Sequence, residues 1–481
     1  MVFFSVVFIF AYLPIVLLGY YALPKKLALI YLFVMNLVFY GWGEPKYLAL
    51  MLVSIALNYA AAIAIERAAN KKPVLAASLA VNLALICFFK YTGLFASTLT
   101  AAAPGFISWL LKLPAFGFLD GATAPALPAG ISFYTFQAMA YLVDVYRGGL
   151  KAERGVLKFS MFFSLFPQLI AGPIVLYRDV ADQIDRRGIS LAGADGGLRL
   201  FICGLSKKLL LANPMGKAWE TFGAAPGQNG VAGAWFGLVA YAFHIYFDFG
   251  GYSDMAVGLG KMLGINFPVN FNYPYISKSI TEFWRRWHMT LSSWFRDYVY
   301  IPLGGSRRGA ARNIFNLAAV WFLTGLWHGA SWNFALWGMY FAVILLAERY
   351  FILSAFDRLK LPFFMRRIYA FGLVVVGWGL FAMTDFSRMF SYVAELFGAS
   401  RAPVGGGVFT PDAFRVAVAF LPTLLACAVA STPLPKLAWA SVTEGRRRFR
   451  ALETAGVFIA FIFCVAAVTA QGYNPFIYFR F

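Results

Sequence analysis

The side chains best suited to proton transfer in this chain are its 3 histidines, His244, His288 and His328. Histidine titrates near neutral pH, which makes it a common general acid or base. The three lie far apart in the sequence, with no close histidine pair and no neighbouring cysteine. Metal and haem sites need ligands at characteristic short spacings. We therefore expect proton-transfer chemistry and no metal.

His328 lies in the segment Thr324–Asn333, in the middle of a long apolar run. An ionisable side chain at membrane depth is costly, by about 2.5–3.5 kcal/mol for full charges, and marks a functional hypothesis. We interpret His328 as a catalytic candidate, with Trp327, Trp332 and Asn333 as supporting residues. The alternative is a neutral histidine that only forms a hydrogen bond between helices.

The segment Thr281–Tyr298 combines aromatic and basic residues and is predicted to be one amphipathic helix. Plotted at helical spacing, its tryptophans share a face with His288, whereas Arg285, Arg286 and Arg296 lie on the other side. Glu282 is expected to pair with Arg285 or Arg286. One interpretation is a helix at the membrane surface whose bases meet anionic lipid. The other is that His288 points into the protein while the three arginines bind an anionic cofactor at the cytoplasmic face.

Two carboxylates, Asp248 and Asp254, flank Gly250 and Gly251 in another apolar stretch. Buried carboxylates need partners. We expect them to line a polar cavity or brace a broken helix, and to pair with arginines of the 285–296 segment. A helix-breaking turn with hydrogen-bonded aspartates is equally compatible with the pattern.

The composition defines the class of protein that must position these residues. The chain has 481 residues, 61% of them hydrophobic and 13% charged, with 41 Lys+Arg against 21 Asp+Glu and a net charge of +20. Its mean hydropathy is +0.70. Soluble domains have about 45–50% apolar and about 25% charged residues. The composition excludes a soluble globular enzyme, a disordered chain and an ordinary nucleic-acid-binding protein, and it predicts an all-α, polytopic membrane protein with a single domain over 1–481.

Long continuous apolar runs predict about 11–13 membrane helices, some of them broken or re-entrant. Residues 1–22 are expected to form a first span and not a cleavable signal peptide. Cys87, Cys203, Cys427 and Cys464 are interpreted as small buried hydrophobic residues. Pro167, Gly172 and Pro173 are expected to break one run, and Gly250–Gly251 another. The candidate spans are 2–22, 27–43, 46–65, 74–98, 130–146, 157–178, 198–213, 231–260, 313–330, 333–353, 366–384, 413–431 and 452–471.

Basic residues between the spans predict an orientation, because cytoplasmic loops carry an excess of Lys and Arg. Lys25–Lys26 follow the first span and Lys71–Lys72 the third, so both loops should be cytoplasmic. The 99–125 loop contains only Lys112 as a base and should be periplasmic. Arg446–Arg448 precede the last span. Both termini are therefore expected on the periplasmic side of the inner membrane.

Several segments together resemble the membrane-bound O-acyltransferase family, and in particular its alginate O-acetyltransferase branch. The resemblance covers nearly the whole chain, with the segments in the family's order. These segments are Leu127–Gln137, Tyr141–Gly148, Phe166–Ile174, Asp248–Asp254, Trp284–Tyr298, Ile301–Gly305, Leu326–Gly329 and the ending Asn474–Phe481.

The resemblance implies a helical bundle around a tunnel that joins the two membrane faces. It implies that His328 is the catalytic histidine and His288 the second functional position. It also implies cytoplasmic acetyl-CoA as donor and a periplasmic acceptor partner, such as an SGNH-type acetyltransferase, that modifies an exopolysaccharide or cell-wall polymer. Asp248, Asp254 and Glu282 are then supporting residues near the tunnel.

Two positions depart from the family pattern. His244 stands where a glutamine or similar polar residue is expected. A basic residue often follows Gly172–Val175 directly in this branch, but here Leu176 and Tyr177 come before Arg178.

Two other classes of protein stay open. A transporter would also have broken helices and charges within the membrane, although the sequence has no evident inverted repeat. A non-catalytic subunit of a polysaccharide-export complex would tolerate loss of His288 and His328.

Overall fold

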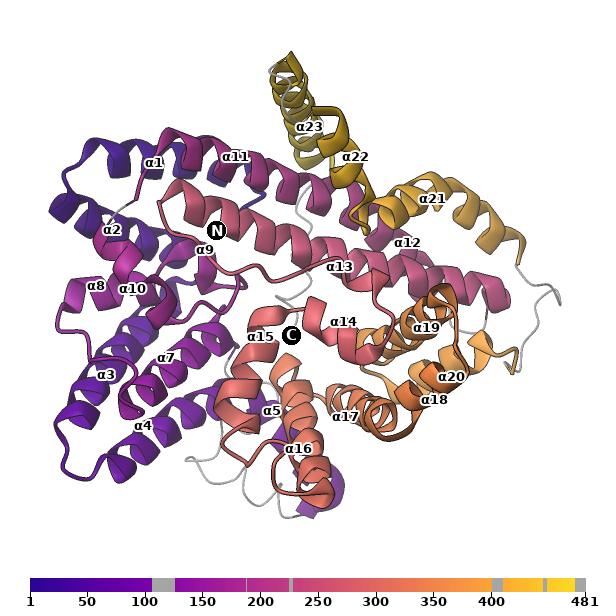
Figure 1. Cartoon of the computed structure of the whole chain (residues 1–481), viewed down its shortest axis with the longest axis horizontal. Helices are drawn as coiled ribbons and strands as arrows, with labels where there is room; N and C mark the ends of the chain where they lie inside the picture. Colours follow the sequence, from indigo (N-terminus) through magenta and orange to yellow (C-terminus); the bar gives the residue numbers. More distant parts are fainter. Residues whose placement is uncertain (106–125, 187, 225–227, 400–409, 444–447, 472–481) are drawn as a thin grey trace. The chain divides into compact units, whose positions relative to one another are not determined.

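The computed structural model describes residues 1–105, 126–186, 188–224, 228–399, 410–443 and 448–471. In this part of the chain the secondary structure is helical, without strands (Figure 1), as the composition predicts. The described chain forms two compact units. The first comprises Met1–Leu198 with Ala256–Pro268, and the second comprises Arg199–Met255 with Val269–Arg480. The single-domain organisation over 1–481 stays a prediction.

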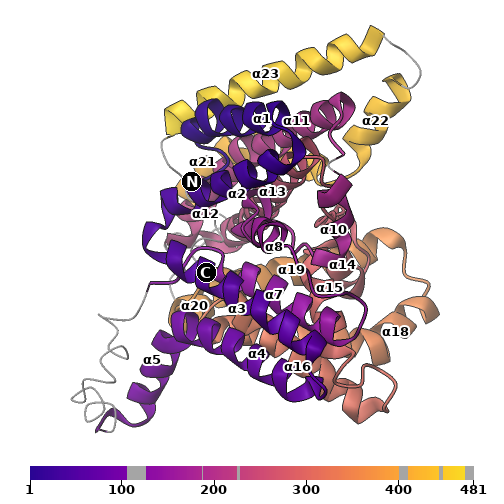
Figure 2. The same cartoon turned by 90° about the vertical axis from the view of Figure 1, so that its left-hand side faces the viewer.

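The first unit contains a group of packed helices in which α3, α4 and α7 lie side by side (Figure 2). A reciprocal amide pair between Asn58 and Asn82, at 2.9 and 3.2 Å, joins α3 to α4. Its helices are η1 (Phe8–Tyr12), α1 (Leu13–Ala22), α2 (Lys25–Gly43), η2 (Pro45–Tyr47), α3 (Leu48–Arg67), α4 (Lys71–Ile86), η3 (Cys87–Tyr91), α5 (Thr92–Ala102), α7 (Ile131–Tyr146), α8 (Val156–Phe163), α9 (Phe166–Leu169) and α10 (Tyr177–Arg186).

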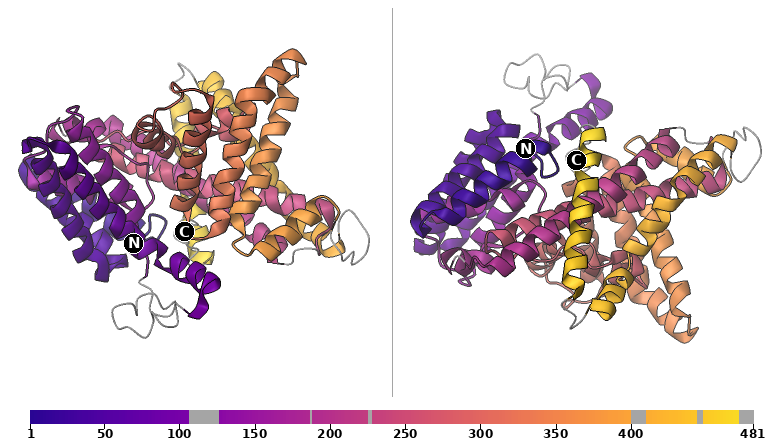
Figure 3. Two further views of the ribbon diagram at one scale, coloured as in Figure 1. Left: turned by 90° about the horizontal axis from the view of Figure 1, so that it is seen from below. Right: turned by 90° about the horizontal axis from the view of Figure 1, so that it is seen from above.

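The second unit carries all three histidines, and α16, α17 and α19 run side by side in it (Figure 3, left). Two helices, α11 (Leu191–Ser206) and α13 (Gly230–Met262), continue from one unit into the other. Its remaining helices are η5 (Lys207–Ala212), α12 (Asn213–Ala224), η6 (Pro274–Ile276), α14 (Ile280–Arg286), α15 (Met289–Phe295), η7 (Arg296–Tyr300), α16 (Ala310–His328), α17 (Trp332–Ala347), η8 (Glu348–Ile352), α18 (Leu353–Arg358), α19 (Phe363–Ala382), α20 (Phe386–Leu396), α21 (Pro411–Ala430), α22 (Leu434–Thr443) and α23 (Arg448–Gln471).

Eight helical stretches of the described chain are long and apolar enough to cross a membrane. The shorter apolar helix Phe8–Ala22 accompanies them, and the other predicted spans form shorter or less apolar helices. The fold class is therefore confirmed. The eight stretches are Lys25–Gly43, Pro45–Arg67, Lys71–Ala102, Gly230–Met262, Trp332–Arg358, Phe363–Ala382, Pro411–Ala430 and Ala451–Ala470.

Two predicted helix breaks have different outcomes. The run 157–178 is broken, because α8 ends at Phe163 and α9 is a single turn that starts beside Pro167. The break at Gly250–Gly251 was predicted wrongly, since α13 is continuous from Gly230 to Met262. A Cβ atom on Gly251 would lie 2.6 Å from the carbonyl oxygen of Gly204. The glycine therefore serves close packing of α13 against α11 and does not bend the backbone.

The four cysteines are free thiols, and the prediction that they are buried is confirmed for two of them and wrong for the other two. Cys427 and Cys464 are buried, whereas Cys87 and Cys203 are exposed. An apolar helix leaves part of its surface outside the protein core, and a small apolar side chain is tolerated there. Most of the 99–125 loop with Lys112, Arg446–Arg447 and the ending Asn474–Phe481 lie outside the described residues, as do the side chains of Arg448 and Arg450.

Candidate functional site

The segment predicted as one amphipathic helix consists of two short helices with a corner at His288. α14 ends at Arg286 and α15 begins at Met289. His288 has a φ of 44°, in the left-handed region. The prediction of a single helix was wrong because no glycine or proline marks this corner. A non-glycine residue in this conformation is strained, and such residues concentrate at functional sites.

The division into two faces nevertheless holds across the corner. Trp284, Trp287, His288, Leu291, Trp294 and Phe295 are all buried. Arg285 and Arg296 are exposed and Arg286 is half-buried. The aromatic side chains of both short helices are buried, so the amphipathic pattern survives although the backbone turns between them.

The N-terminus of α14 is fixed by the side chain of the residue directly before it and by one that is distant in sequence. The Ser279 hydroxyl accepts a hydrogen bond from the Glu282 backbone N–H at 3.0 Å, as an N-cap residue does. The buried Glu348 carboxylate accepts the backbone N–H groups of Ile280 at 2.6 Å and Thr281 at 2.8 Å. A carboxylate at a helix N-terminus is stabilised by the exposed N–H groups. Glu348 thereby ties α14 to the end of α17.

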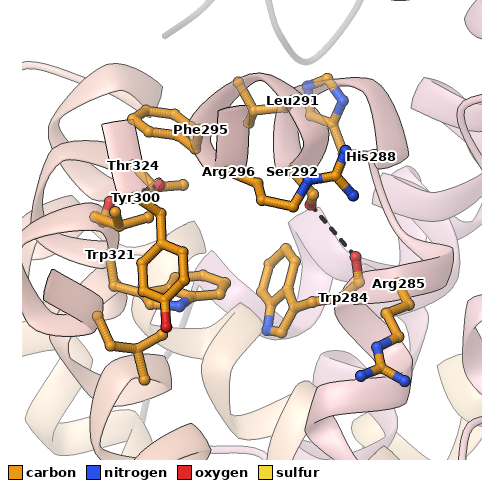
Figure 4. Close-up of a pocket in the computed structure, with 12 residues that line it drawn as sticks. Trp284, Arg285, His288, Leu291, Ser292, Phe295, Arg296, Tyr300, Trp321 and Thr324 are labelled. Carbon is orange, nitrogen blue, oxygen red and sulfur yellow. Dashed lines mark hydrogen bonds between the residues drawn. The ribbon is translucent and has the colours of Figure 1, made fainter. Parts of the chain in front are cut away.

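A pocket of about 240 Å³ lies between this segment and α16. In Figure 4, Leu291 and Phe295 lie on one side of it and Trp284 and Trp321 on the other. The two indole rings are 4.6 Å apart between centroids. A hydrogen bond of 3.3 Å from Ser292 Oγ to the Trp284 carbonyl oxygen spans the α14–α15 corner. The lining is largely aromatic and aliphatic, and its side chains with polar groups include Arg285, His288, Ser292, Arg296, Tyr300 and Thr324.

The three predicted donor-binding arginines have different positions. Arg285 and Arg296 line the pocket. Arg286 does not; its guanidinium binds Glu282 at 2.9 Å, and its Nη1 donates to the Asn272 carbonyl at 3.1 Å. The predicted pairing of Glu282 is therefore confirmed with Arg286. Arg296 contacts Asp297 at 2.7 Å and also lines the pocket, so Arg285 and Arg296 are the cationic groups among the residues that line it.

His288 is 1% exposed and lines the pocket. Its Nδ1 lies 3.1 Å from Oδ1 of Asn270. The ring lies perpendicular to that of Phe249, with centroids 4.8 Å apart. Burial without a charged partner lowers the pKa of His288 to about 3, because removal from water disfavours the charged imidazolium. His288 is therefore neutral at physiological pH.

His328 is the last residue of α16 and is 4% exposed. Its ring is surrounded by aromatic residues, with centroid distances of 4.9 Å to Trp327, 5.1 Å to Trp337 and 5.4 Å to Phe381. Trp327 is also 5.9 Å from the ring of His288, so one indole contacts both histidines. Thr324, at the pocket, lies one helical turn before His328, or about 6 Å along the axis.

The end of α16 is held against α17 by glycines. A Cβ atom on Gly325 would lie 2.2 Å from the Phe334 carbonyl oxygen, and one on Gly338 would lie 2.2 Å from that of Trp321. The backbones therefore approach more closely than other residues would allow. Of the predicted supporting residues on α17, Asn333 is buried and donates to the Leu380 carbonyl at 3.2 Å. Trp332 is 47% exposed.

Asp248 and Asp254 pair with lysines, so their predicted pairing with arginines was wrong. Lys208 Nζ lies 2.5 Å from Asp248 Oδ1, and both side chains are buried. Lys207 Nζ lies 2.5 Å from Asp254 Oδ2 in a more accessible position. The lysines are on η5, beside α13. Asp248 and Asp254 therefore brace the packing of these two helices within the second unit.

The two departures from the family pattern also have structural partners. His244 lies on α13, one turn before Asp248, and its Nδ1 is 2.9 Å from the Ala212 carbonyl oxygen. Arg178, at the start of α10, contacts both oxygens of the buried Asp144 carboxylate of α7 at 3.2 and 3.3 Å. Arg178 thus binds an acidic residue of one of the resembling segments, Tyr141–Gly148.

Four residues at or near the site were missed in the sequence. Lys207 and Lys208 are two adjacent cations within the predicted span 198–213, and Glu348 is a carboxylate in the apolar run 333–353. A charge within an apolar run needs a polar partner, so each of these three residues could have been recognised in the sequence. Asn270 has no such signal, because it precedes the segment in a stretch without periodicity. No group of three or more His, Cys, Asp or Glu residues that could hold a metal was found in the part of the chain described, and the expectation of no metal stays a prediction.

Comparison with known proteins gives this arrangement its context. A family model for the membrane-bound O-acyltransferase family matches residues 150–393. The chain is 36% identical to a probable alginate O-acetylase of Pseudomonas putida over 100% of both chains. It is 33% identical to the peptidoglycan O-acetyltransferase of Helicobacter pylori over 81% of this chain and 79% of the relative.

A more distant similarity, 31% identity over 46% of this chain and 59% of the relative, is to the teichoic acid D-alanyltransferase of Bacillus subtilis. The family model and the relatives covering most of the chain agree with the motifs found in the sequence. They decide against a transporter and a non-catalytic subunit. The chain belongs to the membrane-bound O-acyltransferase family, in its alginate O-acetylase branch, and is a multi-pass membrane O-acetyltransferase.

Proposed function

We propose that this protein takes an acetyl group from cytoplasmic acetyl-CoA and passes it, at His328, through a tunnel to a periplasmic partner that O-acetylates an exopolysaccharide or cell-wall polymer. The protein would lie in the inner membrane with both termini in the periplasm. The observation that carries the proposal is the pocket, which joins two cationic side chains to His288 and ends one helical turn from His328.

The donor's chemistry fits the polar members of this pocket. Acetyl-CoA carries phosphates at one end and a thioester at the other. Arg285 and Arg296 supply fixed positive charge, and guanidinium groups bind phosphate by charge-assisted hydrogen bonds. The apolar lining suits the uncharged arm between the two ends. CoA itself would remain on the cytoplasmic side while the acetyl group moves on.

In the transfer step, the acceptor oxygen forms a bond to the acetyl carbonyl carbon and the bond from that carbon to sulfur breaks. The proton leaves the acceptor hydroxyl and is delivered to the CoA sulfur, which departs as a thiol. His328 carries this proton as general base and then general acid, or it carries the acetyl group itself for one step. The periplasmic acceptor is an SGNH-type acetyltransferase or another acetyl-accepting protein of the polymer pathway.

The first experiment replaces His328 by alanine in cells that make the polymer. Loss of polymer O-acetylation at unchanged protein level is the expected result. Normal acetylation at normal protein level would exclude His328 from the chemistry. His244→Gln is the control, since His244 lies on another helix and contacts a backbone carbonyl.

A second experiment tests the donor site by binding of acetyl-CoA to the purified protein. The double variant Arg285→Ala/Arg296→Ala should weaken binding by about tenfold or more. Arg307→Ala is the matched control, because Arg307 is an exposed arginine between η7 and α16 that does not line the pocket. Equal affinity in all three proteins would mean that the two pocket arginines meet lipid and not the donor.

A further inference from the structure

The side-chain oxygen of Asn270 is the acceptor for three groups around the α14–α15 corner. Oδ1 lies 3.3 Å from the backbone N of Thr290, 3.0 Å from the Thr290 hydroxyl and 3.1 Å from His288 Nδ1. A backbone N–H can only donate. The atom facing it must therefore be the oxygen, because a flipped amide would set two donors against each other.

The orientation of Asn270 determines where the imidazole of His288 carries its proton. An amide oxygen only accepts, so Nδ1 of His288 must be the donor in their contact. Since burial lowers the pKa of His288 to about 3, the ring has one proton only, and it is on Nδ1. Nε2 then presents a lone pair. Nε2 is buried and has no hydrogen-bond partner within the described residues.

The backbone holds this geometry at a conformational cost. The Met289 N–H donates to the Asn270 carbonyl at 3.0 Å, and the Asn272 N–H donates to the Arg286 carbonyl at 2.9 Å. These two hydrogen bonds clamp the corner on both sides of the strained His288. Strain of about 1–3 kcal/mol persists only where the surroundings over-determine it. The corner thus fixes the orientation of the His288 imidazole as well as the backbone conformation.

We infer that Asn270 is a positioning residue that keeps the proton of His288 on Nδ1, so that His288 meets the bound acyl donor as a hydrogen-bond acceptor at Nε2. This inference rests on the proposed function. Nε2 would then accept a hydrogen bond from the ligand. The amide N–H groups in the arm of acetyl-CoA are suitable donors. It excludes polarisation of the thioester carbonyl by His288, because that oxygen needs a donor.

The direct test is nuclear magnetic resonance of the full-length protein labelled with ¹⁵N in its histidine rings. The chain has 3 histidines, so the signals can be assigned with His244→Gln and His328→Gln. The expected spectrum has a protonated Nδ1 and an unprotonated Nε2 for His288 at neutral pH. A protonated Nε2 would overturn the inference.

A variant pair tests the role of Asn270 in the same spectrum and in turnover. Asn270→Leu removes the acceptor and should give a mixture of both ring tautomers and about tenfold or greater loss of turnover. Thr290→Val is the matched control. It removes the hydroxyl contact to the same oxygen but keeps the backbone N–H that orients the amide, so the tautomer should be unchanged. Asn270→Asp, which retains an acceptor oxygen, should restore the proton on Nδ1.

The outcomes separate this inference from the proposed function. Asn270→Leu with the wild-type tautomer would contradict the positioning role. If Asn270→Leu does not fold, the wild-type spectrum and Asn270→Asp still decide. Acetyl transfer by a wild-type protein whose Nε2 is protonated would leave the proposed function intact and refute only this inference. A protein with the expected tautomer but without acetyl-CoA turnover would refute the proposed function and leave the assignment of the tautomer intact.

Discussion

Glu348 Oε1 lies 2.6 Å from the backbone N of Ile280, across 68 residues of sequence. The same carboxylate accepts the Thr281 N–H and hydroxyl. The first turn of α14 is therefore anchored by a buried side chain at the end of α17. Because α14 leads directly into His288, the position of the candidate site depends on this contact.

Loss of the Glu348 carboxylate should destabilise α14. Glu348→Ala leaves the Ile280 and Thr281 N–H groups without their acceptor and should cost about 2–4 kcal/mol. Glu348→Gln keeps one acceptor oxygen and should cost less. Thermal unfolding in detergent measures both, with Glu220→Ala as an exposed control on α12. Equal stability of Glu348→Ala and the control would contradict the anchoring role.

The neutral state of His288 makes a prediction for stability in acid. Burial lowers the pKa of His288 from its ordinary value near 6.5 to about 3. Between these pH values the unfolded chain binds a proton that the folded protein does not, so stability falls as pH decreases from 6.5 towards 3. At pH 5 the loss amounts to about 2 kcal/mol.

Thermal unfolding at pH 7 and pH 5, compared between wild type and His288→Gln, measures this loss. The variant has no group that titrates at this position, so its unfolding temperature should fall less between the two pH values. An identical pH dependence of the two proteins would show that His288 titrates at its ordinary pKa in the folded state.

The buried pair of Lys208 and Asp248 should be sensitive to loss of one partner. Lys208→Met leaves the Asp248 carboxylate buried without its cation and should destabilise the protein by about 3–5 kcal/mol. The double variant Lys208→Met/Asp248→Leu removes both charges and should recover most of that stability. The recovery is measured as the coupling in a double-mutant cycle.

The more accessible pair of Lys207 and Asp254 provides the comparison for this cycle. Its side chains are 30% and 27% exposed, so water can solvate a charge left alone. Lys207→Met should therefore cost about 1 kcal/mol. If the two lysine variants were equally destabilised, burial would not be the cause.

The glycines between α16 and α17 should not tolerate even one methyl group. In Gly325→Ala the new Cβ would meet the Phe334 carbonyl oxygen at 2.2 Å, so the helices must separate at a cost of about 1–3 kcal/mol. Acetyl transfer should fall as well, because His328 ends this helix. Gly372→Ala on α19 is the control, since nothing lies within 4 Å of its added Cβ. Full activity and stability of Gly325→Ala would disprove the close contact.

The fold class and the faces of the segment 281–298 could be predicted because they depend on local pattern. Apolar runs predict membrane helices, and the spacing of Trp284, Leu291 and Trp294 predicts a buried helix face. The corner at His288 could not be predicted, since it is imposed by a hydrogen bond that the Asn270 carbonyl accepts and one that the Asn272 N–H donates. Glu348 and the lysine partners of the aspartates join elements distant in sequence, and helical periodicity does not encode which distant charges will meet.

The two lysine–aspartate pairs of η5 and α13 also bear on how the protein experiences an energised membrane. A single charge that crosses a membrane exchanges about 2.3 kcal/mol with each 100 mV of transmembrane potential. Lys207, Lys208, Asp248 and Asp254 together carry two positive and two negative charges. Their sum is zero, so the potential does no net work on the cluster when it shifts along the membrane normal. The two pairs therefore add no net gating charge to these helices.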